Sequence, residues 1–408
     1  MNAENLTLNA TVGAESTDNA TRVAEINSPI SELQTFEQLA IKGQRLGSYS
    51  LFEADARVES RQFSVQEDLD RTLYLGSTSL FLGTKNSRFA VDVNYFAEEI
   101  LIDPFRGATD ANLDRRNIAS AAGSLRLGNQ VNRLTVRVNR SDIDFDQSNQ
   151  NDAQQTGAGL LYRRSLGATR YLGVDLSGYK MSFDDIDTTF DYRRAALNFG
   201  AARRLFSYDA SLGVNDAGSD TSKHPFYTLD MAYGDTLSKV SLEASQVLTD
   251  TSQGAGADGV VGGAILANGQ TGTIDQYVRR AFFVRWQYAG LCGLCDLTTY
   301  IGHQQELYEK TSQLDSVDQS AGVTFQFQPN RWLVVVLDAE RHNFEFEQQQ
   351  REYSESIYRL SLGSGKLMKR GELKFYAQAA PRDVPTDRAQ EYSVNSYGLT
   401  FNYLLYER

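Results

Sequence analysis

The sequence predicts an all-β fold, a closed antiparallel up-and-down transmembrane β-barrel of about 20 strands, with 18 strands as the alternative. Two observations lead to this prediction: apolar and polar residues alternate over many long runs, and the links between the runs are short and long in turn. A third excludes the helical alternative, because no apolar run reaches the roughly 18 residues that a transmembrane helix needs. The whole chain, residues 1–408, is expected to form one barrel domain.

The alternating runs are the predicted strands. In the run 89–95, Phe89, Val91 and Val93 lie on one face, and Asp92 and Asn94 lie on the other, because successive side chains of a strand point to opposite faces. Similar runs cover residues 5–12, 134–139, 172–177, 227–233, 240–245, 322–328 and 373–378. Strands of roughly 10 to 14 residues suit a bilayer crossing, whereas soluble strands average nearer five or six. The run 71–83 changes phase in its middle, which predicts a β-bulge.

The links fall into two classes that take turns along the chain. Short links occupy residues 83–87, 128–132, 165–170, 234–238 and 328–331, and longer polar links occupy 14–31, 60–70, 97–113, 142–153, 215–224, 249–274, 307–317 and 381–391. Short periplasmic turns and long outer loops are typical of barrels in the outer membrane of Gram-negative bacteria. A soluble sandwich, propeller or solenoid is the alternative, although no repeat near 40 residues is visible.

Charge and the N-terminal residues limit the partners and the location. The net charge of −12 argues against nucleic acid as a partner, because neutralising phosphates requires a basic face. The chain begins without the basic and apolar regions of a signal peptide. For a protein of the bacterial outer membrane, we expect that the signal peptide has been removed from this sequence and that both termini are periplasmic.

The final predicted strand carries a pattern that resembles an assembly signal. Ser396, Gly398, Phe401 and Tyr403 fit the order polar-x-Gly-x-x-aromatic-x-aromatic. The resemblance implies that the barrel-assembly machinery of the outer membrane is a partner. An ordinary aromatic-rich hairpin is the alternative interpretation.

The first 60 residues resemble those of a known family. A first strand ends at Thr17, Asp18 and Asn19, and a second strand leads to a turn and a third strand that bears Tyr49. This opening resembles the outer-membrane β-barrel porin family, including barrels associated with exopolysaccharide and PEP-CTERM (exosortase) systems. The resemblance implies an outer-membrane channel whose partners are outer-membrane lipid, a polysaccharide and a periplasmic export component.

The polar faces of the strands are expected to line a water-filled lumen, because charges of both signs at mid-strand require water. The alternative is that these charges pair across neighbouring strands and rigidify the wall. A lining of mixed sign predicts weak ion selectivity. The predicted lumen-lining residues are Glu53, Asp55, Arg57, Asp92, Asn94, Arg137, Asn139, Asp175, Arg194, Asn198, Asp230, Glu243, Arg279, Arg285, Lys374 and Gln378.

The longest link is rich in glycine and covers residues 251–273. A bore of about 20 strands would leak solutes if it were open, so this segment is a candidate for an eyelet that folds inward and constricts the lumen. A flexible outer loop is the alternative. It is not a phosphate-binding loop, because no Gly-Lys-Ser/Thr follows.

The two cysteines, Cys292 and Cys295, are expected to form a small disulfide in a turn, as an oxidising periplasm allows. Zinc would need two more ligands, and the three histidines lie on separate predicted strands or loops. No metal and no cofactor is therefore predicted.

Two acidic clusters favour a solvated fringe at the outer rim, with a loose divalent-cation site as the alternative. They comprise Asp142, Asp144 and Asp146, and Asp184, Asp185 and Asp187. The calcium-loop template fails because Gln147 stands where glycine is required and Ala153 where glutamate is required.

We do not expect an enzyme, because catalysis would need a nucleophile or an activated water beside a histidine and a carboxylate at one rim. The candidates are His224, His303 and His342, the last with Glu340 close in sequence. No catalytic residue is predicted. The leading functional prediction is a conduit for exopolysaccharide export. A general or substrate-selective diffusion porin for small solutes and a scaffold barrel that encloses a partner protein are the alternatives.

Overall fold

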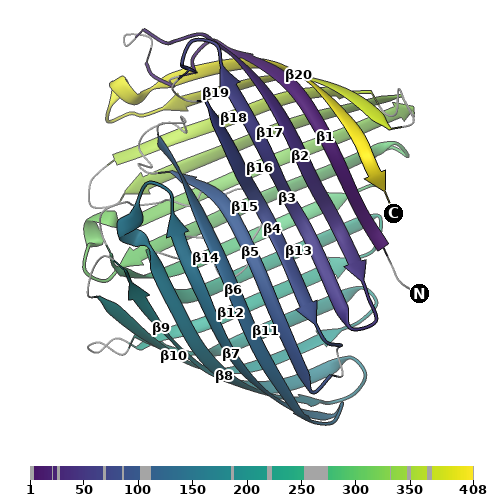
Figure 1. Ribbon diagram of the computed structural model, residues 1–408, viewed down its shortest axis with the longest axis vertical. Helices are drawn as coiled ribbons and strands as arrows, with labels where there is room; N and C mark the ends of the chain where they lie inside the picture. The colour runs from purple at the N-terminus through teal and green to yellow at the C-terminus, as the bar shows by residue number, and fades with distance from the viewer. Residues whose placement is uncertain are drawn as a thin grey trace.

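The computed structural model describes residues 4–20, 22–24, 28–67, 70–84, 87–101, 112–184, 188–217, 223–251, 274–330, 332–346, 351–364 and 370–407. Within these residues, 20 antiparallel strands form one sheet that closes on itself (Figure 1). The prediction of about 20 strands is confirmed, and the alternative of 18 is wrong. No helix among the described residues is long and apolar enough to cross a membrane.

The strands are 11 to 16 residues long, more than a bilayer crossing requires. Their bounds are β1 Glu4–Thr17, β2 Glu32–Leu46, β3 Ser50–Phe63, β4 Arg71–Leu82, β5 Phe89–Leu101, β6 Leu113–Gly128, β7 Asn132–Phe145, β8 Ala153–Ser165, β9 Arg170–Phe183, β10 Thr189–Ala202, β11 Phe206–Asp216, β12 Lys223–Gly234, β13 Ser238–Asp250, β14 Gln276–Tyr288, β15 Cys295–Tyr308, β16 Ser316–Asn330, β17 Leu333–Phe346, β18 Arg351–Gly363, β19 Gly371–Asp383 and β20 Tyr392–Glu407. Short 3₁₀ turns follow β7 (η4, Asn149–Asn151), β15 (η6, Ser312–Leu314) and β19 (η7, Arg388–Gln390).

The barrel closes where β1 pairs with β20, and side chains clasp this seam at its outer end. The Asn395 backbone N–H donates to Asp18 Oδ1 (2.7 Å), and the Asn395 amide donates to Asp18 Oδ2 (2.8 Å). In return the Asp18 N–H donates to the Asn395 carbonyl (3.1 Å). Asn19 adds a bond from its amide to the Ser393 carbonyl (3.3 Å). Two of the three residues that end the first predicted strand, Asp18 and Asn19, thus hold the two ends of the chain together.

Most links alternate as expected. The β9–β10 link, between Phe183 and Thr189, and the β17–β18 link, between Phe346 and Arg351, are exceptions, because they are as short as the turns at the other end of the barrel. The connections that follow even-numbered strands are short and lie at the end of the barrel where both termini lie (Figure 1). Two of these links have the same type of turn. Asn129 accepts bonds from the N–H groups of Val131 and Asn132, and Asp235 accepts bonds from those of Leu237 and Ser238. A side-chain oxygen that accepts from a backbone N–H two residues later fixes a tight turn.

Three long links share a second feature, a hydrogen bond from a backbone N–H at the end of a strand to an aspartate in or after the link. The last residue of β3, β7 or β15 is aromatic, and its N–H donates to an aspartate seven residues later. The pairs are Phe63 with Asp70 (2.8 Å), Phe145 with Asp152 (2.7 Å) and Tyr308 with Asp315 (2.7 Å). A carboxylate on the neighbouring strand, or directly before that strand in the case of Asp275, binds further loop N–H groups: Glu32 binds Val65, Asp114 binds Ser148 and Asp275 binds Thr311. The outer links are therefore structured by repeated backbone capping.

The predicted bulge in the run 71–83 is wrong. The pairing of β3 with β4 runs without a shift from Ser50↔Leu82 to Arg61↔Arg71. The run looked out of phase because both of its faces are apolar near one end. Tyr74 is exposed on the outer face, while Leu73 and Leu75 are buried on the inner face.

Candidate functional site: the narrowed lumen

The outer surface of the barrel carries a continuous apolar belt. Leucine, valine and aromatic side chains on one face of every strand are exposed, as in Val91 and Val93 of β5 and Leu172 and Leu176 of β9. Aromatic residues gather where this face meets the short turns, with Tyr49 74% exposed and Phe89 72% exposed. An even-stranded antiparallel barrel with an outward apolar band and aromatic girdles spans the bacterial outer membrane. The protein is an outer-membrane barrel.

The opposite face of each strand points into the barrel, and the pairing register places all sixteen predicted lumen-lining residues on it. Arg194 forms an ion pair with Asp175 (3.2 Å), and Asp230 stands directly opposite Glu243. Two cavities on this face enclose about 590 and about 640 Å³. The first is lined by Asp92, Arg137, Asn139, Asp175 and Arg194, and the second by Asp230, Glu243 and Arg285. Contact of the sixteen residues with water stays a prediction.

The outer end of β13 leaves the wall and folds into the lumen. Pairing of β12 with β13 stops at Tyr227↔Gln246, although β13 continues to Asp250. The Tyr192 hydroxyl, on the inner face of β10, donates to Asp250 Oδ2 (2.9 Å). Asp250 lies on the same face of β13 as Leu242 and Ala244, which point toward lipid where β13 is still in the wall. Because this face contacts the inner side of β10 at Asp250, the end of β13 lies inside the barrel.

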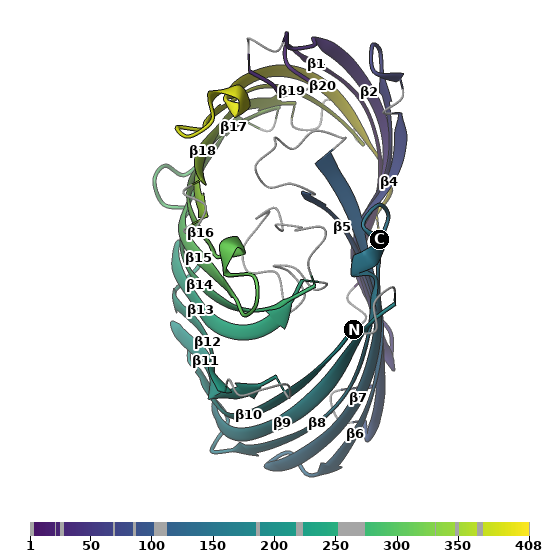
Figure 2. The same cartoon turned by 90° about the vertical axis from the view of Figure 1, so that its left-hand side faces the viewer.

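The outer end of β5 does the same on the other side of the barrel. Its pairing with β4 stops at Gly76↔Ala97, and β5 continues to Leu101. Glu99 then forms an ion pair (3.2 Å) with Arg71 on the inner face of β4. Figure 2 shows the end of β5 inside the ring of the other strands. Because this end covers β4, Leu73 and Leu75 are buried although they face inward.

An apolar cluster joins the two inward ends. It combines Ile100 of β5, Met181 of β9 and Tyr192 of β10 with Leu248 of β13 and Val278 of β14. Strands β5 and β13 are eight positions apart in the wall, so these contacts cross the lumen. Close packing of apolar side chains leaves no room for water. We name this filled region between β5–β10 and β13–β14 the apolar half of the outer lumen. It also buries charged side chains, among them Arg116 (1% exposed) and Asp250 (0% exposed).

The wall formed by β15–β20 and β1–β3 carries ionisable side chains near its outer end, beside two smaller apolar clusters, Phe344 with Phe346 and Tyr392 with Val394. The His342 Nε2 lies 2.9 Å from Glu340 Oε1, and its Nδ1 lies 3.8 Å from Asp318 Oδ1. The Tyr300 hydroxyl donates to Glu340. The Arg61 guanidinium binds Glu59 Oε1 (2.5 Å). We name this wall the polar half of the outer lumen.

Tyrosine rings cover glycines on the inner face of this polar half. The Tyr376 ring lies over Gly398, and its hydroxyl donates to Glu15. A Cβ at Gly398 would collide with the ring, so only glycine permits this approach. Gly398 is part of the predicted assembly signal, together with Ser396, which is buried on the same face, and the outward-facing Phe401 and Tyr403. Its role in assembly stays a prediction.

The predicted eyelet falls mostly outside the described residues, which stop at Thr251 and resume at Ile274. The flanks of the segment do fold inward. Asp250, Asp275 and Tyr277 are almost completely buried, and Asp275 Oδ2 accepts bonds from the N–H groups of Lys310 and Thr311. The stem of this hairpin therefore narrows the lumen, whatever its tip does.

The cysteines and histidines considered for metal binding or catalysis lie in different parts of the barrel. Cys292 and Cys295 are joined by a disulfide in the turn between β14 and β15. His224 lies 2.8 Å from Glu309, His342 lies between two carboxylates, and His303 faces outward. No group of three or more metal-ligating side chains occurs within the part of the chain that the structure describes.

The acidic clusters are engaged elsewhere. Asp142 pairs with Arg140 (3.3 Å) and Asp146 with Arg115 (2.9 Å), both on the outer surface. Asp185 and Asp187 lie outside the described residues, so only Asp184 of the second cluster can be placed.

Comparisons with known proteins add little about function. A scan against protein-family models and a search of curated proteins found no match. Among solved structures, the chain is similar to OccK2 (OpdF) of Pseudomonas aeruginosa, with 12% identity over 98% of each chain and a TM-score of 0.44. It is also similar to the siderophore receptor PirA of P. aeruginosa, with 9% identity, 99% of this chain and 81% of that chain covered, and a TM-score of 0.45. Acinetobacter baumannii OccAB1 has 10% identity, 98% and 97% coverage and a TM-score of 0.42. At these values, function has to be derived from the chain's own residues.

Proposed function

We propose that this protein is an outer-membrane channel through which small hydrophilic solutes diffuse. The observation that carries the proposal is the unequal lining of the outer lumen. The apolar half is filled by packed side chains around Leu248, whereas the polar half presents ionised groups such as Glu340 and Arg61. Charged groups that face a cavity inside a membrane mark a water path.

In this proposal the inward ends of β5 and β13 set the size of the path. A 20-stranded bore lies between the open porins and the plugged transporters. The two inward ends remove part of the cross-section, and the polar half forms the passage that is left. Because that passage carries both acids and bases, weak charge selectivity follows.

Conductance of the purified barrel in planar bilayers tests this function. We expect discrete channels, and we expect deletion of the inward stem together with its tip, residues 248–277, to increase their conductance. Shortening of the β19–β20 link, whose strands pair with neither β5 nor β13, serves as the control. A barrel that never conducts, with or without the deletion, would contradict the proposal and favour a scaffold that holds a partner protein in its lumen.

Export of a polysaccharide is a second, more specific candidate, and the resemblance of the first 60 residues favours it. A polymer would thread the same polar passage. Deletion of the gene should then reduce secreted polymer, and added polymer should block the channel current. Unchanged secretion and an unblocked current would leave the small-solute channel as the function.

A further inference from the structure

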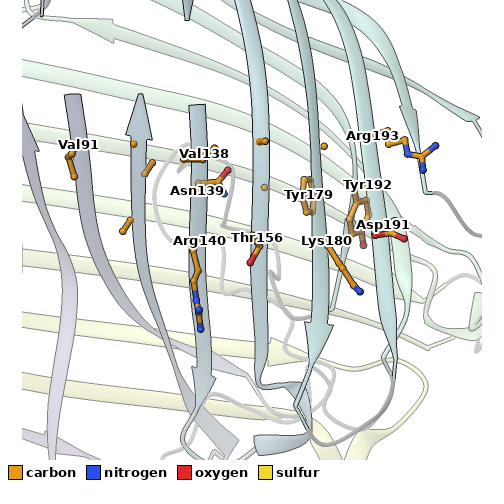
Figure 3. A pocket seen from close by; sticks show the side chains of 16 residues that line it. Val91, Val138, Asn139, Arg140, Thr156, Tyr179, Lys180, Asp191, Tyr192 and Arg193 are labelled. Atoms are coloured by element: carbon orange, nitrogen blue, oxygen red, sulfur yellow. The ribbon is translucent and has the colours of Figure 1, made fainter. Parts of the chain in front are cut away.

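An open hollow interrupts the apolar belt on the outside of β5–β10, and it has a volume of about 820 Å³ (Figure 3). Two rows of the pairing register form it. The lower row contains Val91, Gly123, Val138, Ala158, Gly178 and Arg193. The upper row, which is nearer the long links and is drawn below the lower row in Figure 3, contains Arg140, Thr156, Lys180 and Asp191.

The floor of the hollow is apolar, and the protein does not fill it. Gly123, Ala158 and Gly178 supply no bulk, and a Cβ built on Gly123 would meet nothing closer than 3.8 Å. The next row toward the short turns is bulky again, with Val136, Leu160 and Leu176 side by side. The hollow therefore lies at the edge of the belt, where acyl chains give way to headgroups.

Three basic side chains border the hollow, Arg140 and Lys180 on the upper row and Arg193 at the β10 end of the lower row. Arg140, Lys180 and Arg193 are all exposed on this surface, and Arg140 and Lys180 extend toward the same end of the barrel (Figure 3). Arg140 is paired with Asp142 (3.3 Å). Lys180 stands opposite Asp191 in the register, but neither Lys180 nor Arg193 makes an ion pair or hydrogen bond in the described part of the chain. Two basic groups without a bonded partner among the described residues therefore border the hollow, each with an aspartate opposite it in the register, Asp191 for Lys180 and Asp216 for Arg193.

We infer that this hollow binds one lipid of the outer leaflet that carries an anionic phosphate headgroup. The acyl chains occupy the floor over Gly123, Ala158 and Gly178. Lys180 binds the phosphate with the Thr156 hydroxyl beside it on the neighbouring strand, and Arg193 adds positive charge at the β10 end of the floor. Charge complementarity selects this occupant, because basic side chains at a membrane surface attract anionic headgroups. The inference depends on the membrane location of the barrel but not on conduction.

Native mass spectrometry of the detergent-solubilised barrel tests the inference. Diphosphorylated lipid A is the probe, net-neutral phosphatidylcholine is the lipid control, and inorganic phosphate is the headgroup control. We expect lipid A to remain bound and the other two to be lost. The double variant Lys180→Gln/Arg193→Gln should bind lipid A at least about tenfold more weakly. The matched control Arg280→Gln/Arg341→Gln, which removes two outward basic groups on β14 and β17, should bind like the parent.

A second variant keeps the charge and removes the space. Ala158→Leu should fill the hollow and also weaken binding of lipid A. Equal binding by the parent and both hollow variants would overturn the inference, and so would retention of inorganic phosphate alone. An oligomer that the parent forms and Ala158→Leu loses would assign the hollow to a second copy of the chain instead. Conductance of the same preparations reports on the channel separately, so failure of one proposal is distinct from failure of the other.

Discussion

The two halves of the outer lumen differ in what fills them. The apolar half packs Met181, Tyr192 and Leu248 against each other across the barrel, whereas the polar half presents His342 between Asp318 and Glu340. Both halves are built from strands with the same alternation. The difference arises because the outer ends of β5 and β13 leave the wall and bring their own apolar residues into the lumen between them. A barrel can therefore set its bore without a separate plug domain.

Loss of packing in the apolar half should have the largest effect. Leu248→Ala removes a buried side chain from the cluster and should lower the free energy of unfolding by ~2–5 kcal/mol. Urea denaturation in detergent measures the loss, and channel conductance should rise in parallel. The control is Leu197→Ala, since Leu197 is 56% exposed on the apolar belt. Equal losses for both variants would show that the cluster contributes no special stability.

Loss of the imidazole in the polar half should change selectivity more than stability. His342→Ala leaves Asp318 and Glu340 without their shared partner, and acidic groups in a pore favour cations. We expect the permeability ratio of potassium to chloride to rise about twofold or more, as measured by the reversal potential in a salt gradient. His303→Ala is the control, because His303 faces outward. A ratio that stays the same would place the conducting path away from this wall.

The bond that holds the end of β13 should have a smaller effect. Tyr192→Phe removes the hydroxyl that donates to Asp250, and a buried carboxylate that loses one donor should cost ~1–3 kcal/mol. Single-channel records should show more frequent opening steps. Tyr227→Phe, in which the tyrosine faces lipid, should match the parent. If neither variant changes the free energy of unfolding or the single-channel record, β13 is held by its apolar contacts alone.

The short turns should matter least. Bonds from the N–H groups of Ser238 and Leu237 hold the pKa of Asp235 below its ordinary value of 3.8. A carboxyl group with a lowered pKa stabilises the fold above its unfolded pKa, and this contribution disappears as the pH falls through the folded pKa. Asp235→Ala should therefore lower the urea midpoint slightly at pH 7 and not at pH 2, with conductance unchanged. Asp235→Asn, which keeps an acceptor, is the control, and a loss that persists at pH 2 would contradict this account.

The alternation of residues predicts the faces of the barrel well. Asp92 and Asn94 oppose Val91 and Val93 in the sequence, and the register keeps them opposed. This success follows from the two-residue period of a strand. Once lipid covers one face, the apolar residues must lie on that face and the polar residues on the other. The order of short and long links likewise predicts which end carries the termini.

The inward ends could not be predicted from alternation alone. They combine adjacent apolar residues, Val247 with Leu248 and Tyr277 with Val278, because each end is buried on both faces. The same signal in Leu73 and Leu75 suggested a bulge, when it in fact marks a strand covered from inside. Pairs such as Tyr192 with Asp250 join residues 58 positions apart, and no local pattern encodes such a contact.

The clasp between Asp18 and Asn395 joins residues 377 positions apart. It can form only after the last strand of the chain has been made, so the edge of β1 that faces β20 stays unpaired until then. An exposed edge of this kind can pair with other chains. The same two residues therefore mark the step at which the cylinder loses its last open edge.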